Sequence, residues 1–265
     1  MTAEPAAALV RTAPTLAAED LAALSDGRLI ALRIPHFAAA DTCRRLVPRI
    51  LASPQLGSYG NIRSARRLGM VFYETLSGPA ARAAYFGTAD ESIRAVRDIF
   101  GPGLSPIDRL RLELDEIWPG GALRARMAGG AMFVGTLRAF DGRSEVEPHV
   151  DFLPDDEAQE AWCRALTGQL AANIYLQPAE TGGELEIWDF RPDIDWQDRM
   201  AVPGGYGFAR SALPPPTLRL APRTGELILF DSRCVHSVAP VAGARLSLSC
   251  FIGCAGPDQP LHLWS

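Results

Sequence analysis

Lysine is absent from this chain of 265 residues, because all 26 residues counted as lysine or arginine are arginine. The absence excludes a pyridoxal-phosphate enzyme with a Schiff-base lysine. It also excludes a P-loop nucleotide hydrolase and a protein kinase, which each place a lysine on phosphate groups. Histidine is scarce as well. Chemistry that uses imidazole therefore has four candidates, which are His36, His149, His236 and His262.

Several other signals are missing from the sequence. The net charge is −5 and no basic run stands out, so nucleic acid is not an expected partner. No apolar run reaches the roughly 18 residues of a membrane span, and the N-terminus has no signal-peptide pattern. Five cysteines without paired spacing do not suggest a zinc site. We expect a cytoplasmic protein with reduced thiols.

The first 121 residues predict mainly helices. Apolar positions at helical spacing favour helices over residues 39–51, 79–86, 90–100 and 105–118. In the last of these, Ser105 is placed to cap the N-terminus, with Pro106 at the first helical position. The alternation from Leu110 to Leu114 also admits a strand in the same place.

After residue 121 the pattern changes to short β-type runs between glycine, proline and aspartate. These runs cover residues 122–127, 131–140, 145–150, 169–177, 184–189, 217–221, 226–230, 235–240 and 245–253. Strands spaced in this way, without alternating helices, are typical of a sandwich or barrel. Residues 191–216 are too long and too rich in proline for a hairpin, and we expect a lid-like surface excursion.

One motif in these runs has metal-ligand character. His149 and Asp151 are two residues apart in a β-type run, so their side chains point to the same face of a strand. The tripeptide His-x-Asp alone is common. It gains meaning from its place at a strand end, between Pro148 and Phe152.

Further polar residues follow at fixed distances. A second strand and a turn lead to His236, which is 236 − 151 = 85 residues after the aspartate. Arg245 follows nine residues later and opens the last long apolar strand, with Ser247 two residues further on. Another run contains Asn173 and Tyr175 at the same two-residue spacing.

Together, these motifs resemble the iron(II)/2-oxoglutarate-dependent dioxygenases over residues 122–253. The chain looks most like the bacterial group that acts on small molecules, such as free and N-acyl amino acids. The resemblance implies one domain over residues 1–265. Its fold would be mainly β with α: a double-stranded β-helix, or jelly-roll barrel, over residues 122–255, with the helical region 1–121 packed on it.

The resemblance also implies roles for the quoted residues. His149, Asp151 and His236 would form a facial triad on Fe(II), which leaves positions for 2-oxoglutarate and O2. Arg245 would grip the far carboxylate of 2-oxoglutarate as a bidentate partner. Ser247 would add a hydroxyl, and Tyr175 and Asn173 are further residues expected to bind this co-substrate.

The expected reaction is hydroxylation of an unactivated C–H bond of a small, carboxylate-bearing molecule, with release of succinate and carbon dioxide. The carboxylate of Asp151 favours hydroxylation, because related halogenases have a small residue there; desaturation stays open. The alternatives are a peptidyl hydroxylase of the prolyl type and, remotely, a jelly-roll binding module without catalysis. Candidates for the substrate pocket are Phe152, Trp188 and Arg138, the last of these for a substrate carboxylate. His36 and His262 are expected to be structural.

Overall fold

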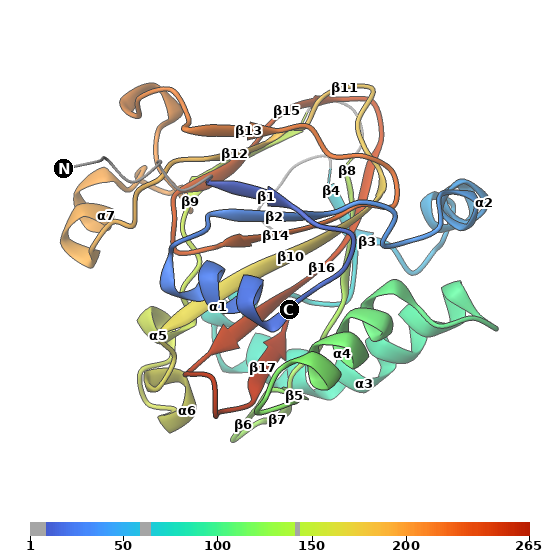
Figure 1. Cartoon of the computed structure of the whole chain (residues 1–265), viewed down its shortest axis with the longest axis horizontal. Helices are drawn as coiled ribbons and strands as arrows, with labels where there is room; N and C mark the ends of the chain where they lie inside the picture. The colour runs from blue at the N-terminus through green and yellow to red at the C-terminus, as the bar shows by residue number, and fades with distance from the viewer. Residues whose placement is uncertain (1–8, 59–64, 141–143) are drawn as a thin grey trace.

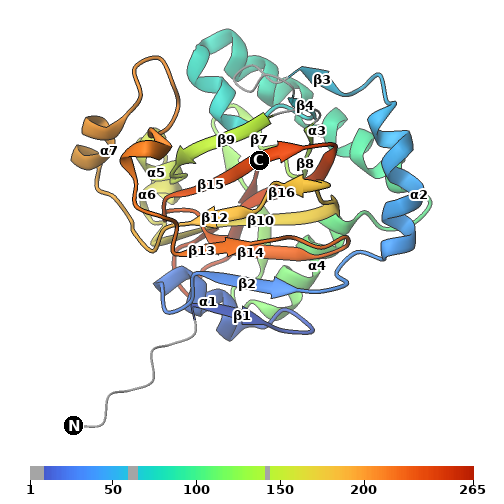
Figure 2. The same ribbon diagram turned by 90° about the horizontal axis from the view of Figure 1, so that it is seen from above.

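Figure 1 shows the computed structural model of the chain, which describes residues 9–58, 65–140 and 144–265. Two sheets face each other, and helices cover the outer side of the larger one (Figures 1 and 2). The helix α7 lies at one end of the sheets and α2 at the opposite end. The result is a mixed, sheet-rich architecture. Across the described part of the chain, the helices are too short or too polar to span a bilayer.

The larger sheet has ten strands among the described residues, in the order β1-β2-β14-β10-β16-β8-β4-β3, with β17 beside β16 and β5 beside β17. Its pairs are antiparallel except β1 with β2 and β17 with β5. The strands are β1 Val10–Thr12, β2 Ala31–Ile34, β3 Gly57–Ser58, β4 Ala65–Leu68, β5 Ala122–Arg124, β8 Thr136–Phe140, β10 Gly168–Gln177, β14 Leu227–Asp231, β16 Arg245–Cys254 and β17 Leu261–Trp264.

The smaller sheet has five antiparallel strands in the described chain, in the order β11-β15-β12-β13, with β9 on β15. They are β9 Ser144–His149, β11 Thr181–Gly182, β12 Leu185–Ile187, β13 Leu218–Leu220 and β15 His236–Ala242. A separate hairpin joins β6 Arg126–Met127 to β7 Gly130–Ala131. The strands expected after residue 121 therefore form, with boundaries that differ by a few residues.

The helices are α1 Ala18–Asp26, α2 Ala40–Leu51, α3 Pro79–Phe100, α4 Pro106–Ile117, α5 Leu153–Asp156, α6 Ala161–Arg164 and α7 Ile194–Met200, with 3-10 turns η1 Phe72–Ser77 and η2 Arg210–Ala212. The segment with the strand alternative is helical. Ser105 caps it by accepting a hydrogen bond from the backbone N–H of Asp108 at 3.1 Å. The two helices expected over 79–86 and 90–100 are one helix, α3.

The central strands β10 and β16 are buried on both faces. On β10, Leu170, Ala172 and Ile174 pack into the core under the helices, while Ala171 and Tyr175 belong to a second core between the two sheets. Both faces are covered, so the strand is an almost continuous apolar run, with few polar residues among its buried positions. A polar side chain on the inner face of β10 or β16 therefore faces the other sheet.

The region before residue 122 also contributes β1 to β4 to the larger sheet, strands that the sequence analysis did not predict. The strand β2 pairs with β14, with Leu227 opposite Ile34. An ion pair crosses the same two strands, because the Arg33 guanidinium donates to the Glu226 carboxylate at 2.7 Å. The N-terminal region is thus part of the larger sheet, in addition to the helices that cover it.

Candidate active site

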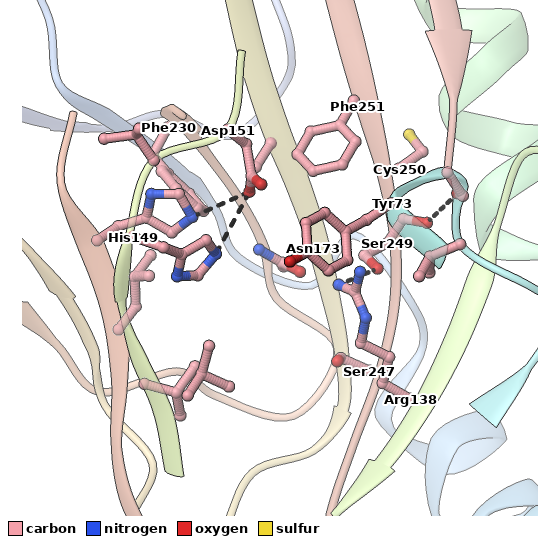
Figure 3. A pocket seen from close by; sticks show the side chains of 18 of the residues that line it. Tyr73, Arg138, His149, Asp151, Asn173, Phe230, Ser247, Ser249, Cys250 and Phe251 are labelled. Carbon is pink, nitrogen blue, oxygen red and sulfur yellow. Dashed lines mark hydrogen bonds and ion pairs between the residues drawn. The ribbon is translucent and has the colours of Figure 1, made fainter. Parts of the chain in front are cut away.

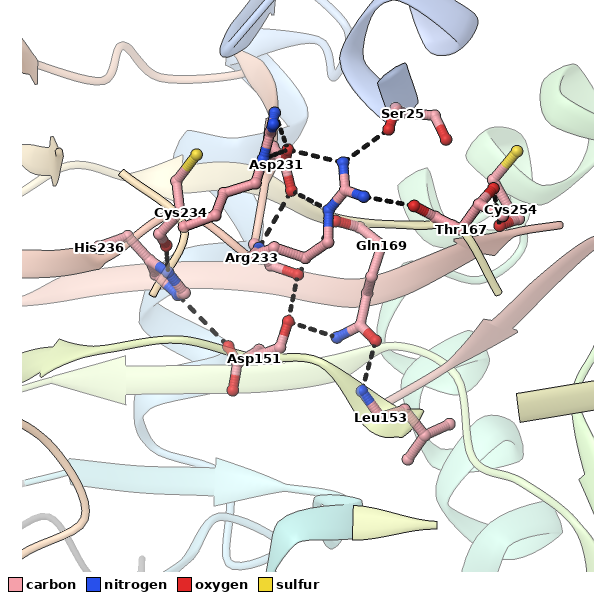
Figure 4. A network of polar contacts seen from close by, with 12 residues as sticks. Ser25, Asp151, Leu153, Thr167, Gln169, Asp231, Arg233, Cys234, His236 and Cys254 are labelled. Carbon is pink, nitrogen blue, oxygen red and sulfur yellow. Dashed lines mark hydrogen bonds and ion pairs between the residues drawn. The ribbon is translucent and has the colours of Figure 1, made fainter. Parts of the chain in front are cut away.

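The strand pairing of the smaller sheet brings three predicted residues together. His149 ends β9, His236 begins β15, and the two are directly paired across the antiparallel strands. Asp151 follows β9 by two residues, and its Oδ2 lies 3.5 Å from Nε2 of His149 and 3.3 Å from Nε2 of His236. All three potential ligand atoms lie within 4.8 Å of one another. Figure 3 shows the His149 imidazole directed at the Asp151 carboxylate, and Figure 4 shows the contact of His236 with Asp151.

Backbone carbonyls fix how the two imidazoles are oriented. Nδ1 of His149 lies 2.7 Å from the carbonyl oxygen of Glu147, and Nδ1 of His236 lies 3.0 Å from that of Cys234. An Nδ1–H that donates to a carbonyl leaves the Nε2 lone pair free for a metal. Two imidazole nitrogens and a carboxylate oxygen on one side are the donor set that suits Fe(II). The residues therefore fit this metal.

The electrostatics of the cluster favour a bound cation. Burial raises the pKa of Asp151, but the charge of His149 and hydrogen bonds from both imidazoles outweigh burial and hold this pKa well below its usual range. Burial also lowers the pKa of His149, but the Asp151 carboxylate outweighs it and raises that pKa. The pKa of His236 is lowered by burial and by His149. An ionised carboxylate beside two imidazole nitrogens can bind a metal cation.

The backbone around Asp151 is held by side chains of the larger sheet (Figure 4). Its N–H donates to the carbonyl of Ser232 at 2.9 Å, and its carbonyl accepts from the Ser232 hydroxyl at 2.9 Å. Gln169, on β10, donates its amide to the same carbonyl at 3.1 Å and accepts from the N–H of Leu153 at 2.8 Å. Gln169 is buried, so both ends of its amide are used to fix this segment.

A second network holds the turn that leads to His236. The carboxylate of Asp231 is fully buried and accepts from Arg191 at 2.8 Å and from Arg233 at 2.8 Å. Arg233 also donates to the carbonyl of Ser25 at 2.6 Å and to that of Thr167. This network ties the β14–β15 turn to α1 and to the start of β10 (Figure 4).

The triad opens into a cavity of about 260 Å³ between the two sheets. Arg245 lines it and is 3% exposed, with its guanidinium carbon 5.1 Å from the ring centres of both Phe140 and Tyr175. Within the described residues it has no carboxylate partner, and its Nε has no hydrogen-bond partner. The Tyr175 hydroxyl is likewise buried and makes no hydrogen bond of normal geometry, although the Arg245 cation beside it counteracts the rise that burial causes in the pKa of Tyr175. Burial lowers the pKa of Arg245.

A buried cation without an acid partner is costly, so this arrangement points to an anionic ligand. The residues expected to bind 2-oxoglutarate gather around it. Ser247 is two residues further along β16 and pairs with Tyr175 across to β10, while Asn173 lies opposite Ser249. Both Ser247 and Asn173 line the cavity. The chemistry of this end of the cavity fits a dicarboxylate such as 2-oxoglutarate.

Two of the three candidate substrate residues line the cavity. Arg138 lines the cavity from β8, where its Nη1 donates to the Ser249 hydroxyl at 2.9 Å, and no carboxylate pairs with it among the described residues (Figure 3). Phe152 also lines the cavity. Trp188 is not among the residues that line the cavity, and it packs with Phe208 and Val235. The Trp188 indole N–H donates to the carbonyl of Pro214 at 2.6 Å.

Other residues line the cavity without a signal that the sequence analysis used. They are Tyr73 in η1, Asp155 and Asp156 in α5, and Gln197 and Tyr206 in the 191–216 excursion. The ring of Tyr206 lies edge-on to His149 with 5.6 Å between centres, and its hydroxyl accepts from the N–H of Glu147 at 2.8 Å. The presence of a long excursion was the one available hint, and it does contact the site. The ring of His262 stacks on the ring of Trp162, and His262 is not one of the triad residues.

A paired-sheet fold with two histidines and an aspartate at one cavity, and a buried arginine in the same cavity, defines a metal-dependent enzyme that binds an acidic co-substrate. Residues 135–253 match the model of the 2OG-Fe(II) oxygenase superfamily. The matched residues include the triad and Arg245, and the match supports the predicted resemblance to the 2-oxoglutarate-dependent dioxygenases.

Two curated relatives and one solved structure are similar to the chain. L-gamma-glutamyl-L-propargylglycine hydroxylase from Streptantibioticus cattleyicolor is 28% identical, over 93% of this chain and 91% of its own. L-isoleucine 3(1)-dioxygenase from Pantoea ananatis is 30% identical over 53% of this chain and 50% of its own. An N-substituted L-amino acid dioxygenase from Burkholderia ambifaria, also solved in complex with alpha-KG, shares the fold with a TM-score of 0.59, at 18% identity over 94% of this chain and 91% of that one.

Proposed function

We propose that this enzyme hydroxylates an unactivated C–H bond of a small amino acid, free or N-substituted. The observation that carries the proposal is Arg245, a buried cation without an acid partner among the described residues, in the same cavity as His149, Asp151 and His236. The relatives hydroxylate or oxidise amino acids or their derivatives, as their names state. This supports the same substrate class here.

The chain's residues divide the task. His149, Asp151 and His236 would hold Fe(II) on one face, and Arg245, Tyr175, Ser247 and Asn173 would hold 2-oxoglutarate. When bound together, Fe(II), 2-oxoglutarate and O2 supply the oxidising power for C–H hydroxylation, with release of succinate and carbon dioxide. Because Asp151 occupies the place where a halogenase has a small residue, we propose hydroxylation as the outcome. Phe152 and the rest of the apolar wall exclude water.

Arg138 is proposed as the anchor of the substrate carboxylate. It is a cation that lines the cavity, and it donates a hydrogen bond to the neutral hydroxyl of Ser249, so the guanidinium can still bind an anion. We further propose that the two sheets form a double-stranded β-helix within a single domain. The mainly antiparallel pairing of the two sheets and the location of the site between them support it. The 191–216 excursion would serve as a wall of the cavity through Gln197 and Tyr206.

The test is a substrate screen with Fe(II), 2-oxoglutarate and O2. Free, gamma-glutamyl and N-acyl forms of aliphatic L-amino acids are tested, together with a proline-containing peptide for the alternative of a peptidyl hydroxylase. Succinate release and a product mass increased by one oxygen are the measured signals. We expect an amino acid to give both signals, whereas turnover of the peptide alone would overturn the substrate class.

Two variants test the residue roles in the same screen. His236→Ala should lose all detectable turnover, and His262→Ala is the matched control that keeps it. Arg245→Met should raise the KM for 2-oxoglutarate by roughly 100-fold, because a charge-assisted bidentate pair is lost. Arg97→Met is its control, since Arg97 pairs with Asp108 on α4 instead. Full activity of His236→Ala, or an unchanged KM in Arg245→Met, would contradict the assignment.

A further inference from the structure

The strand β9 carries a bulge directly before the triad histidine that ends it. The register of β9 against β15 shifts between His149 and Val146. Two residues of β9, Glu147 and Pro148, therefore lie opposite one residue of β15. A bulge disrupts the ladder locally and re-aims neighbouring side chains, and bulges are common beside active sites. The backbone groups of this bulge need hydrogen-bond partners outside the ladder.

The long excursion between β12 and β13 supplies these partners. The Tyr206 hydroxyl accepts a hydrogen bond from the N–H of Glu147 at 2.8 Å, and the N–H of Phe208 donates to the carbonyl of Pro148 at 2.7 Å. Figure 2 shows the excursion beside the end of β9. The approach is close, because a Cβ added at Gly207 would lie 2.4 Å from the Pro148 carbonyl oxygen. The excursion thus takes the place of a neighbouring strand at the bulge.

The same bulge orients one of the two triad imidazoles. The carbonyl oxygen of Glu147 lies 2.7 Å from Nδ1 of His149, so the backbone of Glu147 contacts Tyr206 through its N–H and His149 through its carbonyl. The ring of Tyr206 is also edge-on to that of His149. In contrast, Nδ1 of His236 faces the carbonyl of Cys234, in the turn that follows β14. The two imidazoles therefore depend on different parts of the fold.

The excursion is itself attached to the smaller sheet, which gives Tyr206 a defined position. Arg210 donates to the carboxylate of Glu186 on β12 and to the hydroxyl of Ser237 on β15 at 3.2 Å. The Glu186 side chain is buried, so this ion pair lies inside the protein. Further along the excursion, the carbonyl of Pro214 accepts from the indole N–H of Trp188 at 2.6 Å.

We propose that Tyr206 is a positioning residue for the metal site: its hydroxyl fixes the backbone of Glu147, and the carbonyl of Glu147 fixes the His149 imidazole. Loss of the hydroxyl leaves the Glu147 N–H without its acceptor, so the bulge relaxes and the imidazole is held less firmly. Groups that orient a metal ligand change the affinity for the metal. This inference rests on the proposed function, because it takes His149 as a ligand of Fe(II).

The first test is a titration with Co(II), which needs no turnover. Tyr206→Phe keeps the ring against His149 and removes the hydroxyl, so the Kd for Co(II) should rise by roughly three- to tenfold. Tyr85→Phe is the matched control, because the buried Tyr85 hydroxyl also accepts from a backbone N–H, that of Phe133 at 3.1 Å. Both variants should have a lower Tm, but Tyr85→Phe should keep the wild-type Kd.

A second variant removes the same contact without changing Tyr206. In Gly207→Ala the new Cβ would collide with the Pro148 carbonyl and push the excursion away from β9. The Kd for Co(II) should rise at least as much as in Tyr206→Phe. The control is Gly87→Ala in α3, where an added Cβ has no atom within 4 Å and the Kd should not change.

Nuclear magnetic resonance separates an effect on His149 from a general one. The chain has four histidines, so histidine labelled with nitrogen-15 gives few signals in the Zn(II)-loaded protein. The signals of His149 and His236 are assigned by their loss in His149→Gln and His236→Gln. In Tyr206→Phe the Nδ1 signal of His149 should shift, while that of His236 should stay in place.

The outcomes distinguish this inference from the proposed function. An unchanged Kd for Co(II) in Tyr206→Phe would overturn the inference alone, and so would equal shifts of the His149 and His236 signals. A wild type that binds Co(II) but releases no succinate with any compound of the substrate screen would overturn the proposed function alone. A wild type that does not bind Co(II) would overturn both.

Discussion

Polar groups behind the triad are hydrogen-bonded within the protein, whereas two buried polar groups inside the cavity are not. Behind the triad, Asp231, Arg233 and Gln169 use their polar groups on other parts of the protein (Figure 4). Inside the cavity, the Tyr175 hydroxyl and the Arg245 Nε have no partner. Buried polar groups are normally paired, and each exception calls for an explanation. The first region is a scaffold complete in itself, while the second is complete only with a ligand.

The largest effect is expected from a substitution of Asp231, in the region behind the triad. Asp231→Asn removes the buried carboxylate that two arginines share, so it should lower the free energy of unfolding by about 3 kcal/mol. Chemical denaturation measures the change. The control is Asp26→Asn, which removes an exposed ion pair with Arg28 and should cost less than about 1 kcal/mol. Equal effects of the two variants would mean that the Asp231 network does not stabilise the fold.

A smaller effect is expected where the scaffold meets the triad. Gln169→Leu removes both amide contacts to the Asp151 segment, and the affinity for a metal should fall by about tenfold or more, as for other partners that orient metal ligands. Binding is followed by titration with Co(II), which needs no turnover. Gln177→Leu is the control on the same strand, since the Gln177 amide donates to the carbonyl of Ala244 instead. Identical affinities for the wild type and Gln169→Leu would refute this positioning role.

The smallest effect is expected inside the cavity, where Asp156 should make stability depend on pH. Its pKa is raised to about 6 in the folded protein, mainly by burial, from an ordinary 3.8. Between these values the folded chain retains a proton that the unfolded chain has lost, so this group makes stability fall as pH rises from about 4 to 6. Asp156→Asn removes this pH-dependent loss of stability. Its Tm relative to the wild type should rise by about 2 °C between pH 4.5 and pH 7, and a difference that is constant with pH would contradict the expected titration.

The sequence predicted those features that depend only on residues close together in the chain. The alternation of His149 and Asp151 along a strand places both side chains on one side, and Ser105 followed by Pro106 starts a helix wherever it occurs. The nine residues from His236 to Arg245 fit one strand and one turn, so their spacing could be read directly from the chain.

The features that the sequence did not indicate depend on distant partners. The strand β2 forms by pairing with β14, which is almost two hundred residues away, and nothing in its four residues predicts that partner. Trp188 directly follows β12, and its side chain packs with Phe208 and Val235, which are distant in the sequence. Tyr73 and Asp156 reach the cavity from separate turns, so their role depends on how the elements pack.

The direct pairing of His149 with His236 has a consequence for how the protein is made. The two residues are 236 − 149 = 87 positions apart, and they meet only when β15 pairs with β9. Contacts of such high sequence separation form slowly in folding. A nascent chain therefore has no complete triad until His236 has been synthesised. Binding of a metal by the triad would then report that β9 and β15 have paired.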